Sequence, residues 1–240
     1  ECARIAVGSR MIINATSRQL EALFEAWAVT PGGKLYRWDA DSMDPQAWVL
    51  QSVSVAPVAP ATTPVVVSVV KDVSISSDGM LCALTNEGKM ISYDWSKHAS
   101  TSEAKWSYVN AGAANVALSL SRISVGNVNS IWALDGEKKR IYQLGPDGWQ
   151  ARTNEGIGIS VAAGLDNTVY AVNAQKRLFV WKNEKWDLQA KASVIGFHSV
   201  SVGDARHVIA FKALGAEHQI WQFMPDEKDV EKQWKRFDGV

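Results

Sequence analysis

A sequence unit that recurs five times in the same order most constrains how this chain can fold. The clearest copy reads Ile-Ser-Val-Gly at 123–126, Ile-Trp-Ala-Leu at 131–134, Ile-Tyr-Gln-Leu at 141–144 and a closing Trp149. Each copy holds four short apolar or aromatic runs, separated by residues that favour turns. Runs of this length, rich in β-branched and aromatic residues, are typical of strands. The repeat therefore predicts five similar units of four strands each.

The spacing between the first and second runs supports this alignment, and an alanine follows the second-run anchor in every copy. In the fourth copy we place the first run at 159–162, eight residues before its anchor Tyr170. In three other copies the separation is six residues. Those three pairs are Ser76 and Cys82, Gly126 and Trp132, and Gly203 and Ile209.

Four strands in a repeat of about 35 to 65 residues are typical of a propeller blade. We therefore expect an all-β fold, a single β-propeller domain over 1–240, with five blades of four antiparallel strands. A β-sandwich is the weaker alternative, because sandwiches do not repeat their sequence. Each copy starts with its first strand and ends after its fourth, so we expect the ring to close by side-chain packing between the first and last blades. The expected blades are 4–50, 72–110, 122–152, 158–190 and 198–238, with an insertion at 51–71.

The first copy has an insertion between its first and second runs. Apolar residues recur there at helical spacing within 17–27, and Thr16 with Gln19 matches a capping box. The pattern predicts a short helix in the first blade. The apolar positions are Leu20, Leu23, Phe24 and Trp27.

A second insertion, at 51–70, is rich in Val, Ala, Pro and Thr. Pro57, Pro60 and Pro64 exclude a long helix, because proline lacks an amide hydrogen and clashes with the preceding turn. An extended loop, an extra hairpin and a segment lying on a neighbouring blade all remain open.

Charge and cysteine content exclude several classes of protein. The 240 residues carry 25 basic and 25 acidic side chains, so no basic excess favours nucleic acid. We find no apolar run long enough for a transmembrane helix. Cys2 and Cys82 are too few for a disulfide scaffold or a zinc knuckle, and both one bridge and two free thiols remain open.

No catalytic motif is present in the sequence. None of the four histidines stands in a His-Glu-x-x-His pattern, and there is no nucleophile elbow, phosphate-binding loop or dinucleotide fingerprint. The acidic groups at 39–44 and 226–231 are typical of solvated loops, and the first lacks the glycine and distal glutamate of a calcium loop. We expect no enzyme activity, no cofactor and no metal site.

The unit Ile-Ser-Val-Gly, Ile-Trp-Ala-Leu, Ile-Tyr-Gln-Leu and Trp149 resembles the tectonin repeat of tectonins and of horseshoe-crab and fish-egg lectins. The resemblance is sharpest over 123–149 and weaker elsewhere. It implies a β-propeller that recognises carbohydrate on microbial or cell surfaces, as lectins of innate immunity do. A secreted or cell-surface location is therefore favoured over a cytoplasmic one.

The first functional hypothesis is a lectin that binds glycans through the loops between strands. Sugar sites combine an aromatic platform with planar polar groups, and both occur near the turns that follow the first strands. The polar candidates are Asn127, Asn129, Asp166, Asn167, Asp204 and Arg206. The aromatic candidates are Trp132, Tyr142, Tyr170, Trp181 and Trp221.

The alternative hypothesis is a protein-interaction scaffold, alone or within a larger assembly. The irregular segments 9–26 and 49–72 would contact protein partners, because loops on a rigid propeller are where such function resides. The repeats also diverge from one another, which suits an asymmetric partner that needs no equivalent sites.

Overall fold

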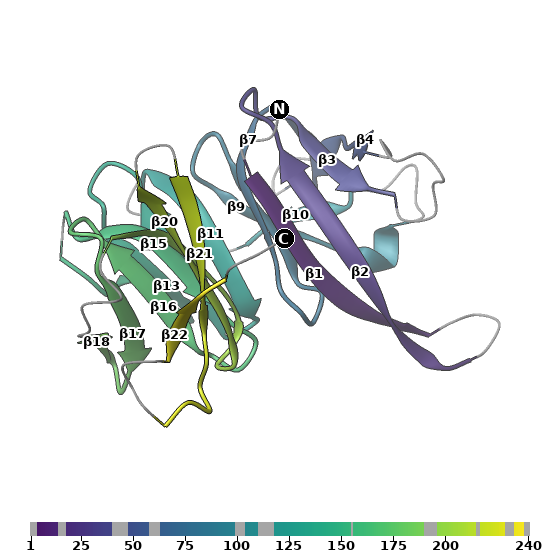
Figure 1. The fold of residues 1–240 in the computed structure, drawn as a ribbon. Helices are drawn as coiled ribbons and strands as arrows, with labels where there is room; N and C mark the ends of the chain where they lie inside the picture. The colour runs from purple at the N-terminus through teal and green to yellow at the C-terminus, as the bar shows by residue number, and fades with distance from the viewer. Residues whose placement is uncertain are drawn as a thin grey trace.

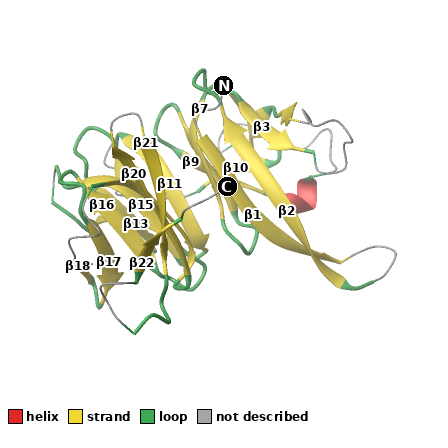
Figure 2. Ribbon diagram, viewed as in Figure 1, coloured by secondary structure: helices red, strands yellow, loops and turns green. Residues whose placement is uncertain are grey.

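The computed structural model shows an all-β chain with five sheets arranged as the blades of a propeller (Figures 1 and 2). This confirms the prediction of five blades with four antiparallel strands. The first strands of all five blades line a central channel of about 370 Å³. The structure describes residues 4–13, 18–39, 48–57, 63–98, 104–109, 118–154, 156–189, 196–214, 217–228 and 233–237.

Every blade is built from consecutive strands, each paired antiparallel with the next. Blade 1 contains β1 (Arg4–Ile13), β2 (Leu20–Val29), β3 (Leu35–Trp38) and β4 (Trp48–Leu50). Blade 3 contains β11 (Leu120–Asn127), β12 (Ser130–Asp135), β13 (Ile141–Gly145) and β14 (Gly148–Ala151). Blade 4 contains β15 (Gly158–Ala163), β16 (Val169–Asn173), β17 (Leu178–Lys182) and β18 (Lys185–Leu188). Blade 5 contains β19 (Phe197–Asp204), β20 (His207–Leu214), β21 (Glu217–Phe223) and β22 (Trp234–Arg236).

Blade 2 carries two strands more than the others. The second insertion forms a hairpin whose first strand pairs in parallel with the outermost strand of the blade, Val55 opposite Trp106. Of the three possibilities left open for 51–70, the extra hairpin is therefore correct. The strands of blade 2 are β7 (Val70–Ile75), β8 (Leu81–Thr85), β9 (Met90–Tyr93) and β10 (Trp106–Tyr108), and those of the hairpin are β5 (Val53–Val55) and β6 (Val65–Val67).

The prediction of a helix within 17–27 of blade 1 is wrong, because this segment forms most of the long strand β2. It pairs with β1 from Leu20 opposite Ile13 to Val29 opposite Arg4. Glu25 lies on the buried face of the strand, so the alternation of apolar and polar residues was masked in the sequence. The described residues contain no α-helix and one short 3-10 helix, η1 (Trp95–Lys97). The proposed cap residue Thr16 lies outside the described residues.

The register of the fourth copy also differs from the sequence alignment at 159–162. A Cβ on Gly126 would lie 2.1 Å from the carbonyl oxygen of Gly164, so these two glycines occupy the same position in adjacent blades. The Oγ of Ser124 accepts a hydrogen bond from the amide of Ala163, and the same contact joins blades 2 and 3. The first run is therefore 161–164, which restores the six-residue spacing. The sequence alignment chose 159–162 because this tetrapeptide, Ile-Ser-Val-Ala, resembles the Ile-Ser-Val-Gly of 123–126 more closely than 161–164 does.

Successive blades pack through apolar side chains that alternate along the first two strands. On β8, for example, Leu81 and Ala83 face blade 1, whereas Cys82 and Leu84 face blade 3. Cys82 is a free thiol, and burial raises its pKa to about 12. Each interior blade therefore needs a neighbour on both sides to bury its strands.

The ring does not close as expected. Among the described residues, strands of blade 1 make no extensive packing contact with strands of blade 5. Ile5 and Val7 on β1 and Ile209 and Phe211 on β20 are exposed, although they carry the repeat pattern of buried positions. The repeat could not reveal this gap, because the end blades have the same sequence pattern as the interior ones.

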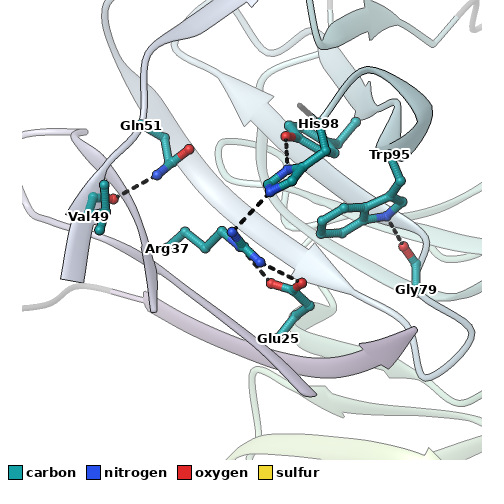
Figure 3. A network of polar contacts seen from close by, with 8 residues as sticks. Glu25, Arg37, Val49, Gln51, Gly79, Trp95 and His98 are labelled. Carbon is teal, nitrogen blue, oxygen red and sulfur yellow. Dashed lines mark hydrogen bonds and ion pairs between the residues drawn. The ribbon is translucent and has the colours of Figure 1, made fainter. Parts of the chain in front are cut away.

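A polar network crosses the interface between blades 1 and 2 (Figure 3). Buried Glu25 accepts two hydrogen bonds from Arg37, at 2.8 and 2.9 Å. Arg37 in turn contacts Nε2 of His98 at 3.2 Å, and Nδ1 of His98 lies 2.7 Å from the Tyr93 hydroxyl. Because a guanidinium can only donate, Nε2 accepts and Nδ1 carries the proton. The hydrogen bond that Arg37 donates to Glu25 raises the pKa of Arg37, so the guanidinium remains charged.

A second buried carboxylate lies between blades 2 and 3. Oδ2 of Asp72 accepts a hydrogen bond from the amide of Ile123 at 2.8 Å, and Arg4 Nε lies 3.8 Å from its other oxygen. Burial outweighs these contacts and raises the pKa of Asp72 to about 6. The folded chain therefore binds the Asp72 proton more tightly than the unfolded chain does.

This raised pKa predicts that stability contributed at Asp72 is present below about pH 4 and is lost as the pH rises through 6. Asp72→Asn keeps an oxygen for the amide of Ile123 and removes the titration. Relative to this variant, the wild type should lose about 2 kcal/mol between pH 4 and pH 7. Urea unfolding at a series of pH values measures the difference. If the free energy of unfolding depends on pH in the same way in the wild type and in Asp72→Asn, the raised pKa of Asp72 is wrong.

Candidate ligand groove between blades 3 and 4

A groove of about 910 Å³ lies between blades 3 and 4. Sites for small ligands typically have volumes of about 300–1,000 Å³. Its apolar floor comes from β13, β15 and β16, through Ile141, Gly158, Ala171 and Val172. The walls come from the segment after β14 and from strands β17 and β18. Three separate parts of the sequence therefore meet in the groove.

Tryptophans form one wall of this groove. Trp181 and Trp186 line it and are half-buried, while Trp132 lies fully buried behind them. The ring centroids of Trp132 and Trp181 are 5.4 Å apart, and those of Trp181 and Trp186 are 5.0 Å apart, both in edge-on arrangements. Trp186 Nε1 also donates to the carbonyl of Arg152 at 2.9 Å. These contacts hold the wall rigid, which suits recognition of a flat apolar surface.

Arg152 lies above this aromatic wall. Its guanidinium carbon is 5.6 Å from the centre of the Trp181 ring. Its Nε donates to the side-chain oxygen of Gln143 at 3.0 Å, and its Nη2 donates to that of Gln150 at 2.9 Å. Both partners are neutral amides, so the contacts orient the guanidinium without cancelling its charge. The groove thus presents a fixed positive group beside an aromatic surface.

Further polar groups surround Arg152. Arg140 adds a second guanidinium, while Asn154 and Gln175 add exposed side-chain amides. Glu184, also exposed, is the acidic residue among the described lining residues. Guanidinium and amide groups bind oxygen atoms of a ligand through directed hydrogen bonds. The charge of the described lining therefore favours a ligand with an anionic group.

The polar residues predicted to bind sugar lie elsewhere, in turns at one end of blades 3, 4 and 5. Asn127 Nδ2 donates to the carbonyl of Leu165 at 2.5 Å and to Oδ1 of Asn167 at 3.1 Å. Asn127 Oδ1 accepts from the amide of Asn129 at 2.8 Å. These three predicted residues are therefore brought together, and they join the turn of blade 3 to that of blade 4.

The same arrangement continues to blade 5. Asp166 Oδ2 accepts from the amide of Ala205 at 2.9 Å. Asp204 Oδ1 accepts from the amides of Arg206 and His207 at 2.8 and 2.9 Å. The turn residues thus form a line of contacts between successive blades, and their role in ligand binding stays a prediction.

The predicted aromatic residues are divided between the blade interfaces and the groove. Trp132, Tyr142 and Tyr170 are buried, whereas Trp181 lines the groove. Trp221 is half-buried in blade 5, where the ammonium of Lys212 lies 4.4 Å from its ring centre. Only Trp181 among the eleven candidates belongs to the groove, and no sequence pattern indicated Arg152.

Among the described residues, no group of three or more His, Cys, Asp or Glu side chains is arranged to hold a metal ion. Within the same residues, no helix is long and apolar enough to cross a membrane.

Comparisons with known proteins support the fold alone. No family model and no curated protein matches the chain. Virginiamycin B lyase from Staphylococcus aureus is similar in structure, with a TM-score of 0.55 and 11% identity, over 98% of this chain and 73% of that chain. A gluconolactonase from Xanthomonas campestris gives a TM-score of 0.53 and 12% identity, over 96% and 75%. The chain spans 62% of YCF48, whose structure was determined bound to a D1 peptide, with a TM-score of 0.49 and 15% identity over 88% of this chain.

Proposed function

We propose that this propeller is a binding protein that recognises a carbohydrate carrying an acidic group, in the groove between blades 3 and 4, and that it performs no catalysis. One observation carries the proposal: Arg152 is held over Trp181 by neutral amides. A carboxylate on a sugar would pair with the guanidinium, while the apolar face of the ring would lie on the tryptophan wall.

The composition of the groove favours binding over chemistry. Its described polar lining consists mainly of guanidinium, amide and hydroxyl groups, which bind ligand oxygens but are poor proton carriers at neutral pH. Glu184 is exposed and has no second carboxylate beside it among the described lining residues, whereas hydrolysis of a glycoside ordinarily uses a pair.

Arg152→Gln tests this proposal. Charge-assisted hydrogen bonds contribute about 1.5–3 kcal/mol, so affinity for acidic glycans should fall about 10- to 100-fold, while affinity for neutral glycans should change little. A glycan array identifies ligands, and titration calorimetry measures both variants. The matched control is Lys182→Gln, which removes a positive charge from an exposed neighbour of the groove without changing its lining.

A third variant separates the groove from the turns. If Arg206→Gln lowers glycan affinity and Arg152→Gln does not, sugar binds at the turns of blades 3 to 5 and the groove proposal is wrong. Absence of binding to any acidic glycan would also overturn it.

A protein-interaction scaffold is the second candidate, and the β5–β6 hairpin favours it. Val65 and Val66 on β6 are exposed at the outer edge of the six-stranded sheet of blade 2. An exposed edge strand can accept a further strand from a partner. For this candidate, affinity purification from the native source would recover protein partners in amounts that Arg152→Gln leaves unchanged.

A further inference from the structure

The first blade exposes a face that all the other blades bury. Ile5 and Val7 on β1 are 62% and 64% exposed. Their counterparts in blade 2, Val73 and Ile75, are buried against blade 1, and the equivalent positions of blades 3 and 4 are buried in the same way. The exposed pair therefore has the chemistry of an interface between blades, but no blade covers it among the described residues.

The last blade exposes the complementary face. Ile209, Phe211 and Ile220 are each 39% exposed. The counterparts in blade 4 are Tyr170, Val172 and Leu178, which are all buried against blade 5. The two ends of the chain thus present the two halves of one blade interface.

A glycine on β19 leaves space on the exposed face of blade 5. Gly126 and Gly164 have the backbone of the next blade within 3 Å of the place where a Cβ would stand. For their counterpart Gly203, the nearest atom is the Cβ of its own neighbour His207, at 3.4 Å. This glycine leaves room for the backbone of a further first strand.

A serine on β19 repeats a second feature of the interface. Ser74 Oγ accepts a hydrogen bond from the amide of Val125 at 3.0 Å, across the interface between blades 2 and 3. The counterpart of Ser74 in blade 5 is Ser201, which is exposed. The counterpart of Val125 in blade 1 is Val7. A face built like blade 1 would therefore bring its valine amide to Ser201.

We propose that a second copy of this chain covers these faces, with blade 5 of one protomer packed on blade 1 of the next. Four packed interfaces fix the arc of the five blades and leave both end faces uncovered among the described residues, and a second copy supplies the matching half of each face. The contact is head-to-tail, because different surfaces meet. A head-to-tail assembly therefore leaves one blade 1 face and one blade 5 face free at its two ends, unless the protomers form a closed ring.

Disulfide trapping between Val7→Cys and Ser201→Cys tests this contact, in a Cys2→Ser background. At the interior counterparts of these positions, the amide nitrogen of Val125 lies 3.0 Å from Oγ of Ser74. Two residues this close are within reach of a disulfide. Mixing the two single variants under mild oxidation should give a covalent heterodimer, at twice the mass of 26.3 kDa. Omission of either cysteine should abolish this product. Absence of a heterodimer from the mixture would overturn the proposal.

The double variant distinguishes the remaining occupants of the two faces. Covalent dimers and longer chains are expected if protomers associate head-to-tail. A product that stays at monomer mass with both thiols consumed would show that blade 1 of the same molecule closes the ring, and would overturn the proposal.

Association in solution gives an independent measurement. The apparent mass from light scattering should rise above 26.3 kDa with protein concentration, and Phe211→Asp should hold it at the monomer value. Because Phe211 is on the exposed face, this change should leave folding intact, as circular dichroism would verify. Val128→Asp, at an exposed turn of blade 3, is the matched control and should associate as the wild type does. A monomeric wild type at all concentrations would refute the contact.

Discussion

Arg37→Ala should lower the free energy of unfolding by about 3 kcal/mol, because it removes the charged donor of two hydrogen bonds to the buried carboxylate of Glu25. Glu25 is 1% exposed, so water cannot replace the two hydrogen bonds from the guanidinium. The same change also removes the donor to His98. Urea unfolding followed by tryptophan fluorescence measures the loss, since Trp27 and Trp106 lie in the adjoining core.

Two controls distinguish the loss of a charged donor to a buried carboxylate from a general loss of packing. Lys89→Ala breaks the exposed pair between Lys89 and Glu87, which has the same 2.8 Å separation, and should have little effect. The double variant Glu25→Met with Arg37→Met replaces both charges with apolar groups and should recover most of the stability. Equal losses in the single and double variants would contradict this explanation.

Gly126→Ala should destabilise the fold by about 3 kcal/mol or more, because overpacking against backbone cannot be relieved by a change of rotamer. The new Cβ would lie 2.1 Å from the carbonyl oxygen of Gly164 and 3.1 Å from the carbonyl carbon of Ala163. Blades 3 and 4 would have to move apart, which would open the core around Trp132. The midpoint of urea unfolding reports the change.

Gly203→Ala is the matched control, since Gly203 occupies the same position of the repeat in blade 5. A Cβ there would meet only its own neighbour His207, at 3.4 Å. At concentrations where the chain is monomeric, we expect a change of less than about 1 kcal/mol. If both alanine variants are equally unstable, the loss comes from the backbone freedom of glycine rather than from the approach of the next blade.

The architecture could be predicted from the sequence because each blade repeats the same strand pattern. The exceptions have physical causes. In blade 1, the buried Glu25 interrupts the alternation that identifies a strand, so helical spacing was the stronger signal. In blade 4, the real first run carries Ala162 where the clearest copy carries Ser124, so a nearby tetrapeptide matched better.

The candidate groove was much harder to predict. Its wall residue Trp181 belongs to the repeat, but Arg152 follows a closing strand and gains its position from Gln143 and Gln150 across a hairpin. Such an arrangement depends on which strands are adjacent rather than on residue spacing. Turn residues such as Asp166 were identified correctly as turns, whereas their contacts with the next blade require the propeller geometry.

The pairing of β5 with β10 constrains the order in which the chain can assemble during synthesis. Val53–Val55 leaves the ribosome well before its partner Trp106–Tyr108, and all of β7, β8 and β9 must be made between them. Contacts between segments so distant in sequence form slowly. We therefore expect the apolar strands of blade 1 and of the hairpin to stay exposed until blade 2 is complete. Chaperone binding during translation would be most useful over this interval.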